Sequence, residues 1–269
     1  MNRVQSQFSL WKEIGFSVEE TQDGSPTLRL LPLSQSTEER PESMHHSGGA
    51  YSESVYIYGE IINEAMRKLS PQKQPVGVLS LGLGLGYNEL LVAATSIQNG
   101  IEKNFRLQSY EIVPELISSF LSFCRGEILA LEVKETYQKM MTFYEKNFRL
   151  APSEILKCLV QAWDEGRWKI DRDFSVISEK ESCHVLLYDA FSGKTNQSLW
   201  TEEFLTRKLM VCSAPDALFG TYACRASLKQ ALKNCNYEIH IRDGFLGKRN
   251  STQARRGVFK VVQANESTT

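Results

Sequence analysis

Three glycines alternate at the junction of an apolar run and a helix-like segment, in residues 76–91, VGVLSLGLGLGYNELL. A strand that enters a helix through glycines can surround a ligand with backbone N–H groups and the positive end of the helix. Dinucleotide enzymes prefer the spacing G-x-G-x-x-G. This chain instead has Gly82, Gly84 and Gly86, with Tyr87 next. The spacing therefore disfavours a dinucleotide, and a glycine turn that binds nothing is the alternative to a ligand site.

Two acidic residues end predicted strands further along the chain. Glu111 ends the strand in RLQSYEIV, where a carboxylate can accept hydrogen bonds from both hydroxyls of a ribose. Asp189 comes at the end of HVLLYDAF, before a short loop and a helix. Ligands of open α/β sheets bind outside the carboxyl ends of the strands, so this position suits a ligand too. Simpler roles stay open, with Glu111 as a solvated side chain and Asp189 as the N-cap of the next helix.

These residues lie in a pattern of alternating strands and helices. VGVLSL reads as a buried parallel strand, YNELLVAATSIQNG as a helix, and a further helix is expected from Pro114 to about Arg125. Apolar residues recur at helical spacing in residues 51–69, and residues 127–170 are largely helix-like. ALFGTYAC is a further strand candidate, and YEIHIRDG and RGVFKVVQ are expected to pair as antiparallel strands around the loop FLGKRNSTQAR. The pattern predicts an α/β fold with a doubly wound sheet.

Five segments resemble, in the same order, the MnmC-type tRNA methyltransferases. The most specific is YDAFSGKTNQSLWTEEF, which is similar to the family's D-A-F-[SA]-P-K-x-N-P-x-L-W. GTYACRASLKQALKNCNYEIHIRDGFLGKR resembles T-[YF]-S-x-x-x-x-V-R-x-x-L-x-x-A-G-F…G-x-G-x-K-R, and VLSLGLGLGYNELL resembles V-L-E-I-G-F-G-T-G-L-N. DGSPTL and MHHSGGAYSESVYIY resemble D-G-x-x-T-L and Y-H-S-x-x-G-A-x-x-E-S-x-x-V-F. Residues 126–182 have no counterpart in these patterns.

The resemblance implies a Rossmann-like fold of the class I S-adenosylmethionine (SAM) methyltransferases, whose first motif has the spacing G-x-G-x-G. It implies a mostly parallel seven-stranded sheet with a C-terminal antiparallel strand pair and a helical insertion at about residues 126–182. Residues 1–70 are expected to form an N-terminal extension of short strands and a helix that covers the cleft. Residues 71–269 are expected to form the methyltransferase domain, without the FAD-dependent oxidase domain that some members carry.

The activity implied is methylation of 5-aminomethyl-(2-thio)uridine at the wobble position of tRNA, to give 5-methylaminomethyl-(2-thio)uridine. SAM is the implied cofactor and the anticodon loop of tRNA the implied partner. Two other functions stay open: a methyltransferase for another amine or nucleoside, and a SAM-fold protein that binds without catalysis. A nicotinamide oxidoreductase is disfavoured by Tyr87, which stands where its third glycine would be.

The resemblance also implies roles for individual residues. Asp189 is the expected catalytic residue, which binds the aminomethyl group and accepts its proton. The expected SAM-binding residues are Ser80, Gly82, Gly84, Gly86, Asn88, Glu111 and Asp189. The expected substrate-binding residues are His46, Ser47, Glu53, Phe191, Lys194, Asn196, Trp200, Lys248 and Arg249. Ser80 stands where the family has Glu, which removes a carboxylate near the methionine end of SAM. Two consequences stay open, a lower affinity for SAM and a changed activity.

Composition bounds the remaining possibilities. The 269 residues are 42% hydrophobic and 23% charged, as in ordinary globular proteins, and the net charge of −1 argues against an overall basic nucleic-acid binder. Lys248, Arg249, Arg255 and Arg256 form a local basic concentration that could contact phosphate. The six cysteines form no C-x-x-C pair and read as buried reduced thiols, so no metal is expected. No apolar run reaches membrane-span length, no signal-peptide core is present, and a cytoplasmic monomer is expected.

Overall fold

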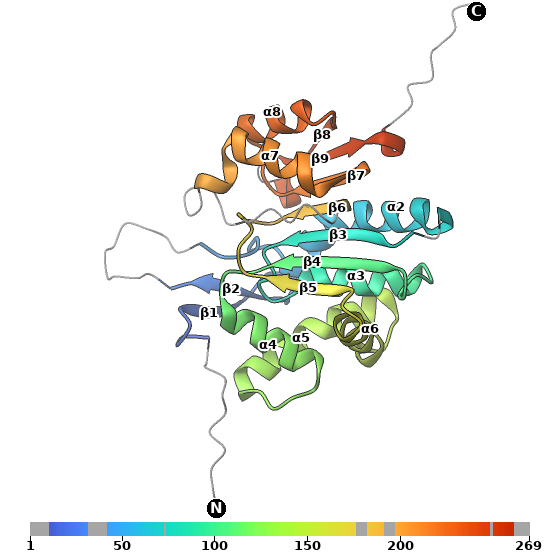
Figure 1. Ribbon diagram of the computed structural model, residues 1–269. Coiled ribbons are helices and arrows are strands. Elements are labelled where there is room, and N and C mark those ends of the chain that lie inside the picture. The colour runs from blue at the N-terminus through green and yellow to red at the C-terminus, as the bar shows by residue number, and fades with distance from the viewer. Residues whose placement is uncertain are drawn as a thin grey trace, which may run out of the picture.

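A seven-stranded sheet runs through the part of the chain that the structure describes (Figure 1). This computed structural model describes residues 11–31, 42–72, 74–175, 182–190, 197–247 and 250–260. The strand order is β5-β4-β3-β6-β7-β9-β8. The strands are β3 (Val76–Leu81), β4 (Phe105–Tyr110), β5 (Trp168–Asp171), β6 (Cys183–Tyr188), β7 (Ser213–Thr221), β8 (Glu238–Arg242) and β9 (Ser251–Arg256). Strands β5, β4, β3, β6 and β7 pair in parallel, and β9 is antiparallel to both of its neighbours.

The strand order contains one reversal, at β3. The chain runs from β3 outwards through β4 to β5, then crosses back to β6 on the other side of β3 and continues to β7. In open α/β sheets the connections on the two sides of such a reversal diverge and leave a crevice outside the carboxyl ends of the strands. The mostly parallel, doubly wound sheet and its C-terminal antiparallel pair, both expected from the sequence, are therefore confirmed.

Helices cover both faces of the sheet. Side chains alternate along β3, so Val76 and Val78 face one helical layer and Leu79 and Leu81 face the other. The first layer contains α2 (Glu60–Leu69), α3 (Tyr87–Gln98), α4 (Pro114–Cys124), α5 (Leu131–Phe148) and α6 (Pro152–Asp164). The second contains α7 (Glu202–Cys212) and α8 (Ala226–Asn234). Figure 1 shows α4, α5 and α6 gathered at the β5 end of the sheet, and α7 and α8 at the β8 end.

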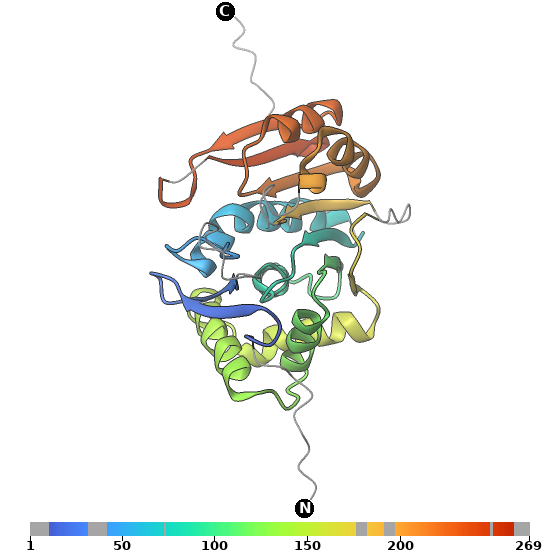
Figure 2. The ribbon, with the colours of Figure 1, turned by 90° about the vertical axis from the view of Figure 1, so that its left-hand side faces the viewer.

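The N-terminal part adds a two-stranded hairpin and a long helical segment. The hairpin pairs β1 (Phe16–Glu20) with β2 (Pro26–Leu30) and lies against α5, as Figure 2 shows in dark blue and light green. The indole of Trp11 donates a 3.2 Å hydrogen bond to Thr136 on that helix. The helical segment begins as α1 (Ala50–Ser54), passes through the π-helical turn Val55–Gly59 and continues as α2. It matches the helix expected over residues 51–69, while the division of the chain at residue 70 stays a prediction.

The last strand differs from the sequence-based expectation. RGVFKVVQ was expected to be a strand, but the strand is β9 in the segment STQARR, and Gly257–Phe259 forms a 3₁₀ turn with a φ of 64° at Gly257. β9 consists mostly of polar residues, and its first three residues, all polar, are nevertheless buried. Hydrogen bonds make this burial possible: the Thr252 hydroxyl donates to Ala223 O at 2.7 Å, and the Gln253 amide donates to Ile57 O at 3.2 Å. Hydrogen bonds replace the apolar alternation that would signal a strand.

A second difference lies in the segment 126–182, which was read as helical. It contains α5 and α6, as expected, and then the four-residue strand β5 at the edge of the sheet. Only Trp168 in this strand is fully buried. A strand this short, with a single buried apolar residue, carries almost no periodic signal.

Candidate functional site

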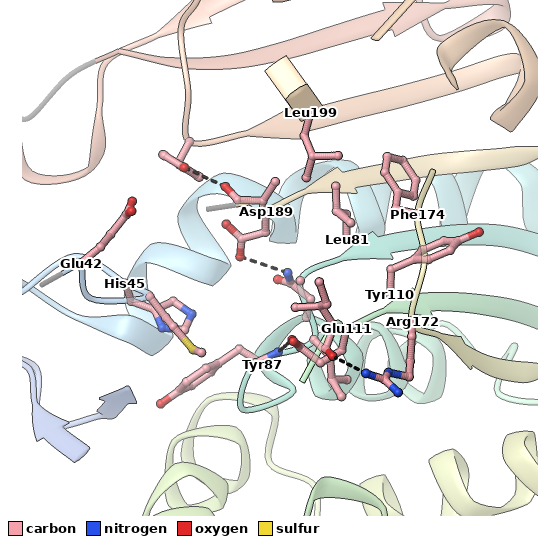
Figure 3. Close-up of a pocket in the computed structure, with 18 of the residues that line it drawn as sticks. Glu42, His45, Leu81, Tyr87, Tyr110, Glu111, Arg172, Phe174, Asp189 and Leu199 are labelled. Atoms are coloured by element: carbon pink, nitrogen blue, oxygen red, sulfur yellow. Dashed lines mark hydrogen bonds between the residues drawn. The ribbon is translucent and has the colours of Figure 1, made fainter. Parts of the chain in front are cut away.

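A cavity of about 460 Å³ opens at the carboxyl ends of β3, β4 and β6 (Figure 3). Its position is that of the crevice beside the strand reversal, and its size is within the range of small-molecule sites. The wall opposite the strand ends comes from residues 42–46 and from Glu53 of α1. The cavity brings together seven of the residues expected to form the site: His46, Glu53, Gly82, Gly84, Asn88, Glu111 and Asp189.

The three glycines of the turn between β3 and α3 are each required for a different structural reason. All three have positive φ, at 90°, 51° and 84° for Gly82, Gly84 and Gly86. Residues other than glycine rarely adopt this backbone conformation. A Cβ on Gly82 would lie 2.6 Å from the carbonyl oxygen of Asp189, and one on Gly86 would lie 2.4 Å from the ring of Phe120. Gly82 and Gly84 line the cavity, while Gly86 lies outside its lining and lets α3 approach α4.

Glu111 joins the glycine turn to the end of β4. One carboxylate oxygen, Oε2, accepts a 3.0 Å hydrogen bond from the Gly84 nitrogen, and the other, Oε1, accepts a 2.9 Å bond from the Val113 nitrogen. Burial raises the pKa of Glu111, and these backbone donors oppose that rise. Each oxygen can accept a further hydrogen bond. Glu111 can therefore hold the turn in place and still receive hydroxyl donors from a ligand.

Asp189 lies where β6 ends, beside Gly82 and Asn88. The side-chain amide of Asn88, in the first turn of α3, donates a 3.4 Å hydrogen bond to Asp189 Oδ2 (Figure 3). Burial raises the pKa of Asp189 to about 6, and contacts with Tyr58 and Asn88 lower it in part. The carboxyl is reached through the cavity and is otherwise surrounded by protein. Asp189 thus combines an accessible oxygen with a pKa close to neutrality, as a group that exchanges protons requires.

Residues before α1 form the opposite wall. Glu53 Oε2 accepts a 2.6 Å hydrogen bond from the His46 nitrogen, and His46 Nδ1 accepts a 2.8 Å bond from the Gly48 nitrogen. The imidazole of His46 also packs edge-on against Phe245, with 5.5 Å between ring centroids. These bonds fold the segment back over the strand ends, so His46 and Glu53 face the cavity. Ser47, also expected to bind substrate, is exposed and does not line the cavity.

Several lining residues were not expected from the sequence. Met44 approaches Gly84, with its sulfur 3.1 Å from where a Cβ would be. His45 Nδ1 shares a 3.0 Å hydrogen bond with the Thr27 hydroxyl, its ring packs against Tyr87, and burial lowers its pKa to about 4. Phe174 lines the cavity from the segment after β5. Met44 and His45 lie in the segment MHHSGGAYSESVYIY, whose resemblance to the family indicated His46, Ser47 and Glu53 but not these two residues.

Besides Ser47, three expected site residues lie outside the lining of the cavity. Trp200 is 4% exposed and packs in the core against Tyr188 and Tyr222, so a stacking role for it is not supported. Gly86 packs against Phe120, as described above, and Ser80 is completely buried in β3. Phe191, Lys194, Asn196, Lys248 and Arg249 lie outside the described residues.

Arg255 and Arg256, the described members of the basic concentration expected from the sequence, are engaged within the protein. Arg255 forms ion pairs with Glu60 and Glu64 on α2, and its side chain is 14% exposed. Arg256 lies over the ring of Tyr237. Arg255 is therefore a structural residue that joins β9 to α2, and a contact between Arg255 and phosphate is not supported.

Ser80 faces a buried carboxylate on the neighbouring helix. Glu89 of α3 is fully buried and accepts a 2.8 Å hydrogen bond from the Ser109 hydroxyl, which in turn accepts one from the Trp168 indole at 3.1 Å. Burial raises the pKa of Glu89 to about 7, while the Ser109 and Ser80 hydroxyls lower it in part. The Ser80 hydroxyl makes no hydrogen bond of normal geometry with the described residues. A carboxylate is thus present beside position 80, supplied by Glu89.

Other chemistries find little support in the described part of the chain. It contains no group of three or more His, Cys, Asp or Glu residues that could hold a metal ion. All six cysteines are free, and five of them are buried, in agreement with the expected reduced thiols. The described helices include none with the length and apolarity to cross a bilayer.

The cavity fits SAM. Glu111 offers carboxylate lone pairs to a ribose diol at the end of β4, and the glycine turn leaves backbone exposed where a side chain would fill the space. Asn88 Oδ1 is buried with no partner among the described residues, so it is free to accept an N–H from a ligand. A buried acceptor without a partner is costly, and a donor supplied by a bound molecule removes that cost.

Comparison with known proteins agrees with this fit. Residues 135–257 match the model of a family described as S-adenosyl-L-methionine-dependent methyltransferase. The match begins within α5, so it includes most of the segment 126–182 for which the sequence patterns gave no counterpart.

Two curated relatives cover most of the chain. The tRNA 5-methylaminomethyl-2-thiouridine biosynthesis bifunctional protein MnmC of Campylobacter hominis is 26% identical over 217 residues, which are 76% of this chain and 28% of that protein. An uncharacterized protein of Methanocaldococcus jannaschii is 25% identical over 256 residues, 92% of this chain and 62% of that protein. This chain therefore spans less than two thirds of the length of either relative.

A solved structure shares the fold. The crystal structure of MnmC2 from Aquifex aeolicus has a TM-score of 0.59 at 21% identity, and the alignment covers 94% of this chain and 72% of that one. At this identity the likeness establishes the α/β methyltransferase fold.

Proposed function

We propose that this chain, an MnmC-like and SAM-dependent methyltransferase, methylates the exocyclic amine of 5-aminomethyl-(2-thio)uridine at the tRNA wobble position. The product would be 5-methylaminomethyl-(2-thio)uridine. The observation that carries the proposal is the carboxyl group of Asp189, which faces the cavity next to the glycine turn. The name of the C. hominis relative, a tRNA 5-methylaminomethyl-2-thiouridine biosynthesis protein, supports the choice of nucleoside.

When bound, SAM supplies a methyl group on a positively charged sulfur, which an amine nitrogen can displace in line. The residues of the chain have to orient the two partners and present a neutral amine. If the amine has a pKa like that of lysine, about 10.4, its deprotonation at pH 7 costs roughly 4–5 kcal/mol. Burial in the cavity and a nearby positive charge both lower that pKa.

Asp189 is suited to receive the proton or to orient the amine. With a pKa of about 6 it is mostly ionised at pH 7, and its charge attracts the ammonium form of the acceptor into the cavity. The same charge also stabilises the ammonium, so the carboxylate contributes most if the proton passes on to water. Glu53 brings a second carboxylate to the same cavity, which favours a cationic or amine-bearing acceptor over a neutral one.

A target base at the wobble position lies in a single-stranded loop, where it can leave the stack and enter a cavity. The expected contacts of Phe191, Lys194, Asn196, Lys248 and Arg249 with the substrate are part of this proposal. Asp189, Asn88 and Glu111 line one cavity. This arrangement favours a methyltransferase over a protein that binds SAM without catalysis.

The decisive experiment is methyl transfer to tRNA of defined modification. The protein is incubated with methyl-labelled SAM and with tRNA that carries 5-aminomethyl-2-thiouridine, and the nucleosides are analysed by mass spectrometry. Methylation confined to that nucleoside is the expected result. The matched control is the same tRNA with unmodified uridine at the wobble position. Binding of SAM without methylation of either tRNA would exclude the proposed acceptor.

A further inference from the structure

We propose that Tyr58 is a positioning residue for Asp189, and that its hydroxyl donates a hydrogen bond to the Asp189 carboxylate in the catalytic complex. The inference rests on the proposed function, in which Asp189 meets the acceptor amine. It assigns a role in the site to a residue of the helical segment before β3.

The backbone places Tyr58 by an unusual turn. The helical segment 50–69 is α-helical at both ends and π-helical over Val55–Gly59, with Tyr58 inside the π-helical turn. Single π-helical turns within α-helices are rare and occur often at functional sites, because the extra residue changes which side chains face the neighbouring structure. Here the turn directs Ile57 and Tyr58 into the interior, where they are 3% and 1% exposed.

A glycine in the sheet makes room for the ring of Tyr58. A Cβ on Gly220 of β7 would lie 2.7 Å from Ile61 Cδ1 and 3.4 Å from Tyr58 Cδ1. Gly220 pairs with Leu187 of β6, two residues before Asp189. The ring therefore rests on the sheet beside the strand that ends at Asp189, and the close approach depends on the missing side chain.

The hydroxyl of Tyr58 is buried and has no hydrogen-bond partner of normal geometry among the described residues. Burial raises the pKa of Tyr58, and the Asp189 carboxylate is the charge that contributes most to the rise, ahead of Glu53 and Tyr222. The phenol therefore keeps its proton and faces an acceptor. Tyr222 is not a competitor for Asp189, since its hydroxyl donates to Ala190 O at 2.8 Å. Catalytic hydrogen bonds are often long without substrate and shorten when it binds.

Two donors from different helical segments would then hold Asp189. Asn88 reaches Oδ2 from α3, and Tyr58 would reach the carboxylate from the helical segment before β3. Donors to a carboxylate favour its ionised form and fix its rotation. The lone pairs that remain would be directed to the amine in the cavity, which is where a proton acceptor has to point.

The test compares Tyr58→Phe with Tyr137→Phe. Both substitutions remove a buried hydroxyl that has no partner among the described residues. Tyr137, however, lies on α5, and its pKa is raised by burial and by the charges of Cys124 and Glu111, not by that of Asp189. The first measurement is a carbon-NMR titration of Asp189 in each protein, with the resonance assigned by Asp189→Asn. Loss of a hydrogen bond to an ionised group should raise the Asp189 pKa by about one to two units in Tyr58→Phe and leave it unchanged in Tyr137→Phe.

The second measurement is methyl transfer to tRNA that carries 5-aminomethyl-2-thiouridine. Tyr58→Phe should lower the turnover number by about tenfold or more, shift the acid limb of the pH profile to higher pH, and leave SAM affinity within about twofold of the wild type. A fluorinated tyrosine at position 58 keeps the shape of the ring and makes the phenol a stronger donor. It should move the Asp189 pKa in the opposite direction, to lower values.

The outcomes separate this inference from the proposed function. A wild-type protein that methylates no such tRNA overturns the acceptor assignment, while the NMR titration still decides the role of Tyr58. An Asp189 pKa that is the same in wild type, Tyr58→Phe and the fluorinated protein overturns the inference about Tyr58, whatever the activity.

Discussion

The main-chain nitrogen of Gly84 donates a 3.0 Å hydrogen bond to the carboxylate of Glu111, 27 residues further along the chain. This bond joins the glycine turn to the neighbouring strand end, so the two parts of the cavity that would receive a nucleoside are fixed to one another. In the proposed site, the carboxylate would act on the protein and on the ligand at the same time. Its removal should therefore affect both the shape of the turn and the affinity for SAM.

Glu111→Gln tests that double role. The amide has a single acceptor oxygen, so it cannot accept from both the Gly84 and Val113 nitrogens as the carboxylate does. We expect the dissociation constant for SAM, measured by calorimetry, to rise about tenfold or more, because hydrogen bonds to a charged acceptor are lost. Glu115→Gln, on the exposed first turn of α4, is the control and should bind SAM as the wild type does. Equal affinity in the two variants would contradict the role of Glu111.

Asp189→Asn should separate catalysis from cofactor binding. The amide keeps the size of the side chain and loses the negative charge that would accept a proton. We expect turnover in single-turnover methyl transfer to fall about a hundredfold or more, and the dissociation constant for SAM to change by less than about threefold. The exposed Asp164→Asn is the matched control. Equal turnover in Asp189→Asn and wild type would exclude Asp189 from the chemical step.

Glu89 should make stability depend on pH. Its pKa is about 7 in the folded protein against a model value of 4.5, so the folded state binds the proton more tightly than the unfolded state. The folded protein is therefore favoured most below pH 4.5, loses stability as the pH rises from 4.5 to 7, and loses no more above that. The loss amounts to about 3 kcal/mol.

The measurement for Glu89 is urea unfolding of wild type and Glu89→Gln at several pH values. Asp189 and His45 also have shifted pKa values, so the informative quantity is the difference between the two proteins. The free energy of unfolding of Glu89→Gln, relative to that of the wild type, should increase between pH 4.5 and 7 and then stay constant. A difference that does not change with pH would show that Glu89 is not a buried titrating group.

Gly86→Ala and Gly100→Ala distinguish packing from backbone strain. Both glycines have positive φ, at 84° and 65°, but an added Cβ meets the Phe120 ring at 2.4 Å in the first and nothing within 4 Å in the second. We expect Gly100→Ala to cost about 1–2 kcal/mol of unfolding free energy, and Gly86→Ala about 1–3 kcal/mol more. Urea denaturation measures both. Equal losses would contradict the packing of Gly86 against α4.

The sequence predicted the parts of the structure that have local signals. VGVLSL is β3, and the glycine spacing and the strand ends at Glu111 and Asp189 were visible because strand, turn and helix follow one another within a few residues. The alternation of strands and helices was enough to predict a doubly wound sheet, because parallel strands need such crossovers.

Other parts could not be predicted, because they depend on contacts between distant segments. β9 is a strand made of polar residues, and its burial is acceptable only through bonds to Ala223 and Ile57. The residues next to Trp200 in the sequence are compatible with a role in the core and with a role in stacking on a base. The structure shows that Trp200 lies in the core. His45 lines the cavity, but its hydrogen bond to Thr27 and its contact with Tyr87 join distant segments, so its place could not be read from the sequence alone.

The position of β9 in the chain determines when its contacts can form during synthesis. This strand, near the end of the described chain, lies between β7 and β8, and β8 has no other partner in the sheet. Gln253 of β9 also donates to Ile57 in the π-helical turn that carries Tyr58. While the nascent chain still ends before residue 251, β7 presents an open edge, β8 has nothing to pair with, and the turn lacks one of its anchors. The anchor that Gln253 gives to the π-helical turn is therefore added only after translation has passed β9.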